Sequence, residues 1–379
     1  MNIPFNKPHL TGKEAHYMYQ AVAEGKLSGN GAFTKRCQHF FEERYGFKRC
    51  LLTTSCTDAL EMAAILCDIQ PGDEVIVPSY TFVSSALAFV RTGAKIVFAD
   101  SLKENPNIDA EKIEALITSR TKVIVPVHYA GVACDMDRIM EIANKHNLIV
   151  VEDAAQAIDS YYKGKPLGSI GHLSTFSFHE TKNIISGEGG MLCINDERFI
   201  RRAEIIWEKG TNRAEFFRGE VNKYGWVDTG SSFLPSEVIA AFLWAQLENL
   251  DEIQSRRKHL WDLYYTHLSP LASSPNSLIA LLEVPDYATN NAHMFYLVCN
   301  CLEQRTALIK HLKEHDIQAV FHYLSLHSSP YYTDKHDGRD LPECDRYADC
   351  LVRLPLFYDL TEEQVIEVCD VINAHLSCK

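Results

Sequence analysis

Short apolar runs alternate with segments of helical periodicity from about residue 50 to residue 206. The runs are rich in Val and Ile and show little polar alternation, which is typical of strands buried on both faces. They predict strands at 74–78, 95–99, 123–127, 148–151, 175–178 and 191–194. Helices are predicted near 58–67, 82–91, 109–118, 135–145 and 197–207. This alternation predicts an α/β fold with a mainly parallel central sheet and helices on both of its faces.

The pattern changes after Gly230. Residues 236–268 have apolar positions spaced as on one long helix, and we expect Pro270 and the segment after it to break the chain. Strands are predicted beyond this point at 293–298 and 317–321, and helices at 304–315 and 361–376. Such a mixture is typical of an α+β arrangement.

The last predicted helix begins with Thr361-Glu-Glu-Gln364, a capping-box pattern in which both side chains bond backbone N–H groups. The chain has 379 residues, which at about 100–200 residues per domain allows two domains. We therefore predict an N-terminal arm and large domain over residues 1–249 and a smaller α+β domain over residues 250–379.

Charge and cysteine content narrow the class of protein. The formal net charge is -13 and the pI is about 5.7, so nucleic acid is not an expected partner. The 12 cysteines form no CxxC pair, and Cys67 and Cys193 lie inside apolar runs, as reduced thiols of a cytoplasmic protein do. The chain begins without a signal-peptide pattern, and no run approaches the ~18 apolar residues that span a bilayer. We expect a soluble cytoplasmic protein with no membrane partner.

The segment LIVVEDAAQ, residues 148–156, places acidic side chains at the end of an apolar strand. In an open α/β sheet, ligands bind beyond the carboxyl ends of the strands. A carboxylate there can pair with the ring nitrogen of pyridoxal phosphate (PLP) and keep it protonated. Asp153 is the candidate for this role, and Gln156 can reach the phenolic oxygen. The alternative is that Asp153 only caps a helix.

The segment TFSFHETKN, residues 175–183, supplies a candidate for the lysine that tethers PLP. Lys182 stands alone among hydroxyl and aromatic residues, and a glycine cluster follows at 187–190. A lysine becomes a covalent catalyst when burial or cationic neighbours lower its pKa. His179 lies three residues earlier and is a further catalytic candidate. The alternatives are a surface lysine in a loop and a histidine that only packs.

The segment LLTTSCTDALEMAAIL, residues 51–66, places a Thr/Ser cluster before an amphipathic helix. Free N–H groups at the start of a helix form an anion site. Thr57 and the backbone of Cys56 and Asp58 are therefore candidates for binding the PLP phosphate. The alternative is simple N-capping by Ser55 or Thr57.

Other motifs are weaker. Gly29 and Gly31 lack the third glycine and the preceding strand of a dinucleotide fingerprint. His322 and His327 have no clear ligand set around them, so no metal site is predicted. The loop 208–213 has donors for a nucleotide diphosphate but is equally typical of a solvated loop. The nearby aromatic residues are more typical of packing or of a dimer surface; they are Phe216, Phe217, Tyr224 and Trp226.

The segments TSCTDAL, VPSYTF, VEDAAQ, FSFHETKN and GEGG occur in an order that resembles the sugar aminotransferases of the DegT/DnrJ/EryC1/StrS family. The resemblance implies PLP as the cofactor, the PLP-dependent fold type I (aspartate aminotransferase-like) and a homodimer. It also implies that Lys182 holds PLP as a Schiff base, with Asp153 at the pyridine nitrogen and Gln156 near the ring hydroxyl. Further residues are implied in contact with the cofactor: Ser177, Thr57 and Asp58 at the phosphate, and Phe82 on the ring face.

Six further stretches resemble family members that aminate a dTDP-linked keto sugar. They are 126–137, 208–213, 216–219, 291–296, 319–323 and 353–358. This resemblance implies L-glutamate as the donor and the 4-keto carbon of a dTDP-4-keto-6-deoxyhexose as the acceptor. Amination at C3, or of a related nucleotide-linked sugar, is the alternative. At 230–237 the chain has Ser232 where the wider family supplies an asparagine to the neighbouring subunit's phosphate, so that contact is expected to differ.

Two other functions are alternatives to this reaction. Dehydratases on the same scaffold have a histidine in place of the lysine, so Lys182 argues against that chemistry. A protein that only binds a nucleotide sugar would release no 2-oxoglutarate from glutamate.

Overall fold

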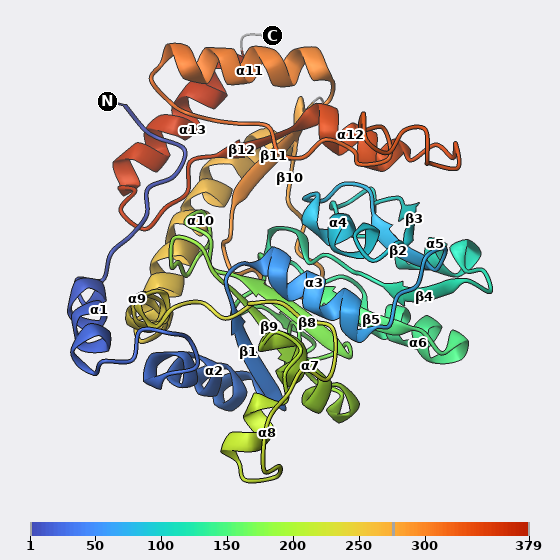
Figure 1. The fold of residues 1–379 in the computed structure, drawn as a ribbon. Helices are drawn as coiled ribbons and strands as arrows, with labels where there is room; N and C mark the ends of the chain where they lie inside the picture. Colours follow the sequence, from blue (N-terminus) through green and yellow to red (C-terminus); the bar gives the residue numbers. More distant parts are fainter. Residues whose placement is uncertain (1, 275–276, 378–379) are drawn as a thin grey trace.

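The computed structural model describes residues 2–274 and 277–377, and its centre is a seven-stranded sheet in the order β1-β9-β8-β5-β4-β2-β3 (Figure 1). The strands are β1 (Arg49–Thr53), β2 (Glu74–Pro78), β3 (Lys95–Ala99), β4 (Thr121–Ile124), β5 (Ile149–Asp153), β8 (Leu173–Ser177) and β9 (Gly190–Ile194). Neighbouring strands from β8 to β3 are parallel, whereas β9 is antiparallel to both β8 and β1. The predicted mainly parallel α/β fold is confirmed.

Helices connect these strands near the predicted positions. They are α3 (Cys56–Leu66), α4 (Ser84–Val90), α5 (Ala110–Ile113), α6 (Met136–His146) and α7 (Ile200–Trp207). The start of α6 shows why its position could be predicted, because Asp135 accepts a hydrogen bond from the N–H of Arg138 at 3.3 Å. The helix ends where Asn147 takes a left-handed conformation with φ of 55°. Both signals lie beside the helix in the sequence.

Strand β1 and the two N-terminal helices, α1 (Glu14–Ala23) and α2 (Ala32–Tyr45), were not predicted. The start of α2 depends on a distant residue, because Glu237 accepts the N–H groups of Gly31 at 2.9 Å and Phe33 at 2.8 Å. A Cβ at Gly31 would lie 2.4 Å from the Glu237 carboxyl carbon. The glycine at position 31 therefore serves this close approach and not a dinucleotide site.

The single long helix predicted over 236–268 is wrong, since the chain forms α9 (Glu237–Leu247) and α10 (Leu250–Ala272). At the junction the side-chain amide of Asn249 donates to the Ala245 carbonyl at 2.8 Å. The helix ends at Ala272, before the segment that was predicted to break the chain, but Pro270 itself lies inside the last turn of α10. The Thr266 carbonyl, which a proline cannot bond, accepts the Ser269 hydroxyl at 3.4 Å. The Ser269 hydroxyl thus takes the place of the backbone N–H that Pro270 lacks.

A second, antiparallel sheet contains β10 (Ile279–Leu281), β11 (Phe295–Cys299) and β12 (Leu351–Leu354). It packs with α11 (Leu302–Glu314), α12 (Pro342–Cys350) and α13 (Glu362–Ser377). The predicted strand at 317–321 is wrong, since this segment makes only isolated bridges, from Ile317 to Ile3 and from Val320 to Arg353. The capping box is confirmed, because Thr361 and Gln364 exchange side chain to backbone bonds of 3.0 and 3.2 Å.

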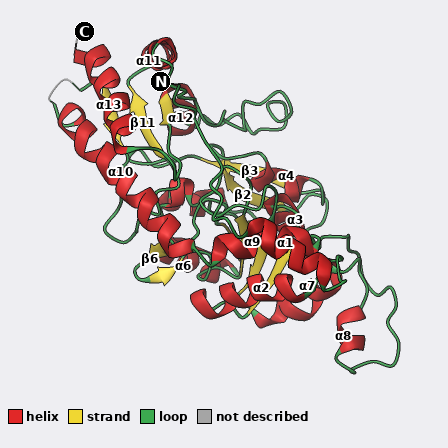
Figure 2. Ribbon diagram, turned by 90° about the vertical axis from the view of Figure 1, so that its left-hand side faces the viewer, coloured by secondary structure: helices red, strands yellow, loops and turns green. Residues whose placement is uncertain are grey.

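Helix α10 runs from the large sheet to the small one, as Figures 1 and 2 both show. It begins at the predicted domain boundary, but one hydrophobic cluster includes buried residues of both sheets, so the division at 249/250 stays a prediction. A small two-stranded sheet, β6 (Tyr161–Tyr162) and β7 (Lys165–Pro166), lies to one side. The short helix α8 (Arg213–Phe217) lies on an excursion that projects from the body (Figure 2). Among the described residues, no helix has the length and apolar character needed to cross a membrane.

Candidate active site

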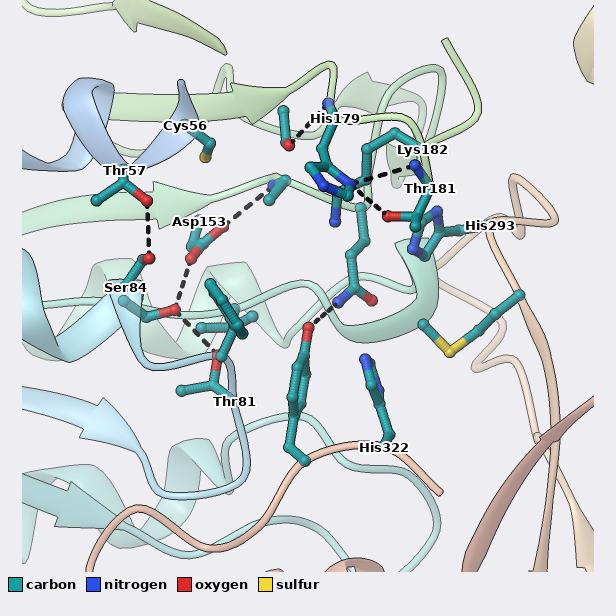
Figure 3. A pocket seen from close by; sticks show the side chains of 18 of the residues that line it. Cys56, Thr57, Thr81, Ser84, Asp153, His179, Thr181, Lys182, His293 and His322 are labelled. Carbon is teal, nitrogen blue, oxygen red and sulfur yellow. Dashed lines mark hydrogen bonds between the residues drawn. The ribbon is translucent and has the colours of Figure 1, made fainter. Parts of the chain in front are cut away.

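A cavity of about 600 Å³ lies where the carboxyl ends of large-sheet strands meet the small sheet. Its lining comes from three sources: the large sheet and its loops, the small sheet with residues 322–323, and the N-terminal segment at Phe5 and Asn6. Lys182 and Asp153 both line it and point into the same space (Figure 3). A cavity of this size suits a cofactor together with part of a substrate.

Asp153 ends β5 on the cavity side. Its carboxylate accepts the Ser85 hydroxyl at 2.7 Å and the Ala155 N–H at 3.1 Å, and the Ser85 hydroxyl lies 3.0 Å from that of Thr81. These bonds hold a buried carboxylate in one orientation. The alternative that Asp153 caps a helix is wrong, because turns and no helix follow β5, and the carboxylate faces the cavity.

Glu152, the preceding residue, points to the opposite face of the sheet. It is fully buried and accepts the N–H groups of Gly168 and Ile170, each at 2.8 Å, and its carboxylate lies 2.9 Å from His128 Nε2. His128 Nδ1 accepts the Cys134 N–H at 3.2 Å, so Nε2 carries the hydrogen and donates to Glu152. This network fixes the strand end from behind, and of the two acids at the end of β5 it is Asp153 that lines the cavity.

Lys182 lies in the loop after β8, and its backbone N–H donates to the His179 carbonyl at 2.9 Å. Burial lowers the pKa of Lys182; the carboxylate of Asp153 opposes this shift, and the positive charge of Arg353 adds to it. In the described part of the chain no carboxylate forms an ion pair with the Lys182 amine. The amine is therefore easier to deprotonate than that of a surface lysine, as a covalent catalyst requires.

The start of α3 forms the end of the cavity where the sequence predicts an anion site. Ser55 caps the helix by accepting the Asp58 N–H at 3.0 Å, so the capping alternative holds for this residue. Thr57 does not cap; its hydroxyl lies 2.8 Å from that of Ser84 and lines the cavity beside Cys56. Within the described residues no acceptor bonds the N–H groups of Cys56 and Thr57, as an oxyanion site at a helix start requires.

Gly190, the first residue of β9, makes this placement possible. A Cβ there would lie 2.4 Å from the Ser55 carbonyl and 2.5 Å from the Cys56 nitrogen. Any larger residue would therefore push the start of α3 out of position. The glycine cluster that follows Lys182 in the sequence thus serves the anion end of the site.

The other predicted residues divide into two groups. Those that line the cavity are Gln156, Ser177, Phe82 and His179. Gln156 is held by the Ala130 N–H at 2.6 Å and by the Tyr323 hydroxyl at 3.0 Å, whereas 56% of Phe82 is exposed. Asp58 does not line the cavity, because its carboxylate bonds the hydroxyls of Thr54 and Ser55.

Ser232 is exposed and pairs with Glu208 through a backbone bridge, outside the cavity of its own chain. The loop 208–213 and the aromatic residues after it also lie outside this cavity. Phe217 and Trp226 expose 69% and 85% of their surface. None of these positions completes the cavity within one chain.

Sequence patterns missed the wall that the small sheet contributes. It includes His293, His322, Tyr323 and Arg353. The Nδ1 atom of His293 lies 2.9 Å from the Asn183 side-chain oxygen, and that of His322 lies 2.6 Å from the Tyr129 hydroxyl. Burial lowers the pKa of both histidines far below the usual value, with help from nearby positive charges. Only the family-specific stretches at 291–296, 319–323 and 353–358 pointed to these residues.

His327 does not join this site, since its ring bonds Ser79 at 2.8 Å elsewhere in the fold. A search over residues 2–274 and 277–377 finds no group of three or more Cys, His, Asp or Glu side chains placed to hold a metal ion.

The residues present fit PLP. The two N–H groups at the start of α3 and the hydroxyls of Thr57 and Ser177 suit its phosphate, Asp153 suits a protonated ring nitrogen, and Lys182 suits its aldehyde. Residues 8–373 match the sequence pattern of the DegT/DnrJ/EryC1/StrS aminotransferase family. The chain belongs to this family.

Individual relatives agree over nearly the whole length. A protein of Escherichia coli O157:H7 named GDP-perosamine synthase is 33% identical over 378 residues, covering 100% of this chain and 99% of that protein. A GDP-perosamine synthase of Caulobacter vibrioides is 35% identical over 373 residues, covering 97% of this chain and 96% of that protein. The PLP form of the sugar aminotransferase Spr1654 from Streptococcus pneumoniae superposes with a TM-score of 0.90 at 26% identity, with 100% and 99% covered.

The aminotransferase is therefore PLP-dependent and acts on a sugar, which confirms the predicted family, fold type, cofactor and enzyme class. The solved structure of DesV from S. venezuelae superposes on this chain with a TM-score of 0.89 at 28% sequence identity. The match covers 99% of this chain and 98% of that chain. The two synthases are named for a GDP-linked sugar, whereas the sequence predicted a dTDP-linked one. The sugar and its nucleotide stay predictions.

Proposed function

We propose that this aminotransferase moves the amino group of L-glutamate to the 4-keto carbon of dTDP-4-keto-6-deoxy-D-glucose. The products are dTDP-4-amino-4,6-dideoxy-D-galactose and 2-oxoglutarate. This is the reaction of dTDP-4-amino-4,6-dideoxygalactose transaminase of enterobacterial common antigen synthesis, which the six family-specific stretches resemble. The single observation that carries the proposal is that four of these six stretches supply lining residues of the one cavity that holds Lys182 and Asp153.

The four stretches are 126–137, 291–296, 319–323 and 353–358, which supply Val127, His293, Met294, His322, Tyr323, Arg353, Leu354 and Leu356. Cofactor and substrate are recognised on different walls, because the motifs shared with the wider family lie on the large-sheet wall. Residues that select the sugar are expected on the remaining wall, where three of these four stretches lie. This placement supports a substrate preference shared with the proteins that the stretches resemble.

Asp153 and Lys182 have separate roles in the proposed reaction. When bound, PLP supplies an electron sink for the amino-group transfer. Asp153, held by Ser85 and the Ala155 N–H, keeps a negative charge behind the ring nitrogen. Lys182, once its amine is free, carries a proton between its own nitrogen and the reacting substrate carbon. Its lowered pKa makes the neutral amine available for this step.

We further propose that the enzyme is a homodimer in which Ser232 of one subunit approaches the phosphate site of the other. The exposed position of Ser232 outside its own cavity supports this, as does the exposed aromatic surface around α8. Light scattering on the purified enzyme tests it, and a monomeric mass at micromolar concentration would contradict it.

Product analysis tests the substrate. The enzyme is incubated with L-glutamate and, in parallel, with dTDP-4-keto-6-deoxy-D-glucose and its GDP-mannose-derived 4-keto-6-deoxy counterpart. NMR of the product sugar then reports the aminated carbon and its configuration. An axial C4 amine on the dTDP sugar is expected. Turnover of the GDP sugar alone, or amination at C3, would overturn the proposed substrate and leave the aminotransferase activity intact.

A further inference from the structure

Two neutral histidines face the cavity from the small-sheet wall. His293 precedes β11, His322 lies in the loop that follows Val320, and both rings line the cavity that holds Lys182 (Figure 3). Burial lowers the pKa of both histidines far below the usual value, so both rings are uncharged. A neutral imidazole has one nitrogen that donates and one that accepts. What each ring offers the cavity through Nε2 therefore depends on the bond that its Nδ1 makes.

Asn183 fixes the ring hydrogen of His293 on Nδ1. The Asn183 side-chain nitrogen donates to the Asn291 backbone carbonyl at 2.8 Å and to the Gln254 side-chain oxygen at 2.7 Å. Because a backbone carbonyl can only accept, the other end of the Asn183 amide is its oxygen, which lies 2.9 Å from His293 Nδ1. Nδ1 therefore carries the hydrogen and donates it. Nε2 of His293 keeps a lone pair, to which no group of the described residues donates.

Tyr129 fixes the opposite arrangement in His322. The Tyr129 hydroxyl lies 2.6 Å from His322 Nδ1, and burial raises the pKa of Tyr129 well above the usual value, so the hydroxyl keeps its hydrogen. Within residues 2–274 and 277–377 this hydroxyl has no other bonded acceptor; the Tyr80 ring is 5.5 Å away, and its own hydroxyl has no hydrogen-bond partner there. Tyr129 therefore donates to Nδ1. Nε2 of His322 carries the ring hydrogen.

Other contacts keep both rings in place. The His293 carbonyl accepts Nη2 of Arg257 at 2.8 Å, and the His293 N–H donates to the Asn291 side-chain oxygen at 3.0 Å. The His322 ring stacks on Tyr323, with 3.5 Å between ring centroids and 25° between ring planes. The small-sheet wall thus presents one fixed hydrogen-bond acceptor and one fixed donor.

We infer that these two histidines recognise the neighbouring hydroxyl groups at C2 and C3 of the keto sugar: Nε2 of His293 accepts a hydroxyl hydrogen, and the His322 N–H donates to a hydroxyl oxygen. The inference rests on the proposed function, in which the acceptor is a 4-keto hexose. A hydroxyl both donates and accepts, so the two hydroxyls suit both rings. The amino-acid donor is a poorer match, because a carboxylate only accepts and the lone pair of His293 would repel it.

The position of Lys182 assigns one hydroxyl to each ring. Lys182 comes first among the charges that add to burial in lowering the pKa of His293, whereas Arg353 comes before Lys182 for His322. His293 therefore lies on the side of the reacting carbon, C4. The C3 hydroxyl is attached beside that carbon and is assigned to His293, and the C2 hydroxyl is assigned to His322.

Sugars that lack one hydroxyl test this assignment in the sugar half-reaction, which is followed through the absorbance of the bound cofactor. In the wild type, kcat/KM for the 3-deoxy sugar is expected to be at least about 10-fold lower than for the parent sugar, because the His293 lone pair then stays unbonded. His293→Asn keeps an amide N–H near the place of Nδ1 but does not reach the place of Nε2. In this variant the difference between the two sugars should shrink to about twofold or less.

His322→Asn is expected to do the same for the 2-deoxy sugar. A purely structural role would slow the parent and deoxy sugars alike and leave their ratio unchanged. His293→Gln places an amide oxygen near the position of Nε2 and should restore part of the 3-deoxy difference. His172→Asn is the matched control, since His172 lies outside the cavity and its Nδ1 accepts the Val150 N–H at 3.0 Å.

Nuclear magnetic resonance checks the two rings without any turnover. In the wild-type holoenzyme labelled with ¹⁵N-histidine, long-range ¹H–¹⁵N correlations are expected to show the hydrogen on Nδ1 of His293 and on Nε2 of His322. The two Asn variants assign the signals. Tyr129→Phe should leave His322 as a mixture of both forms, because the donor to its Nδ1 is then gone.

Hydrogens found on the opposite nitrogens would overturn the inference, as would deoxy differences that stay unchanged in both Asn variants. Should an Asn variant fail to fold, the wild-type spectra and the wild-type deoxy differences decide, and equal rates with parent and deoxy sugars would overturn it. Turnover of the GDP-linked 4-keto sugar alone would overturn only the proposed substrate. The deoxy analogues of that sugar would then decide the inference by the same comparison.

Discussion

The large-sheet wall and the small-sheet wall of the cavity differ in how their polar side chains are bonded. On the large-sheet wall several polar side chains are bonded to one another, as Asp153 is to Ser85 and Thr57 is to Ser84, around the lysine and the helix start that would hold the cofactor. On the small-sheet wall His293 and His322 have depressed pKa values, and Arg353 lacks an acidic partner among the described residues. A wall of hydrogen-bonded side chains suits a cofactor that stays bound. A wall with an unpaired charge suits substrates that bind and leave in each cycle.

This difference explains how one site can serve two unlike substrates. The cofactor needs the same contacts throughout, so preorganised hydrogen bonds on the large-sheet wall lose nothing between steps. The proposed donor is an amino acid with a carboxylate, and the proposed acceptor is a sugar attached to a diphosphate. Variants of the large-sheet wall should therefore affect both half-reactions, while variants of the small-sheet wall should affect one.

The largest effect is expected from Lys182→Ala. Both half-reactions should slow by at least about 10³-fold, because the covalent tether and the proton carrier are the same amine. The absorbance band of the lysine-bound cofactor should vanish, and circular dichroism should show an unchanged fold. A variant that keeps the band would show that another residue holds the cofactor.

The second-largest effect is expected from Asp153→Asn. The amide keeps nearly the same shape and can still accept the Ser85 hydroxyl, but it carries no charge for the ring nitrogen. Turnover should fall about 10²- to 10³-fold in both half-reactions.

Glu152→Gln is the neighbouring control, because Glu152 is buried on the other face with His128 and the Gly168 N–H. It should lower the free energy of unfolding by about 1–3 kcal/mol. If its activity per folded molecule fell as far as that of Asp153→Asn, the division between the two faces of β5 would be wrong.

Thr57→Val tests the anion end of the large-sheet wall. The methyl group replaces the hydroxyl that lies 2.8 Å from Ser84, at nearly constant volume. The Kd for PLP should rise about 10- to 100-fold, as expected for one lost bond to a charged group. Equilibrium dialysis measures it. A change in KM for glutamate with no change in cofactor affinity would move this residue to the substrate side.

The smallest effect concerns pH and the small-sheet wall. The pKa of His293 is lowered by burial and by the charges of Lys182 and Arg257, so the folded protein keeps the ring neutral where the unfolded chain binds a proton. Stability from this residue is present above pH 6.5 and is lost as pH falls below it. Between pH 8 and pH 6 the loss should be about 0.8 kcal/mol.

Urea unfolding at both pH values measures this loss in the wild type and in His293→Gln. The variant should show a smaller pH dependence and should keep its cofactor. An identical dependence in both proteins would mean that His293 does not contribute to it.

Much of the fold and half of the site could be predicted from sequence because their signals are local. The strands of the large sheet are short apolar runs, and the capping box of α13 lies within four residues, Thr361 to Gln364. Asp153 and Lys182 each stand at the end of a strand pattern. The break between α9 and α10 could not be seen, since the apolar spacing continues through Asn249 and only the folded chain shows the change.

What the sequence determined by itself is the class of chemistry: an acid and a lysine that follow strands of a mainly parallel sheet, and a helix start with free N–H groups. What only the tertiary structure decided is the other half of the cavity. His293, His322 and Arg353 come from segments far along the chain, and their patterns are those of ordinary strands and loops. Their importance arises from burial and from the groups that the fold places beside them, which are properties of the packed molecule. A residue's charge is written in the sequence, but whether that charge is already neutralised depends on which distant groups the fold places beside it.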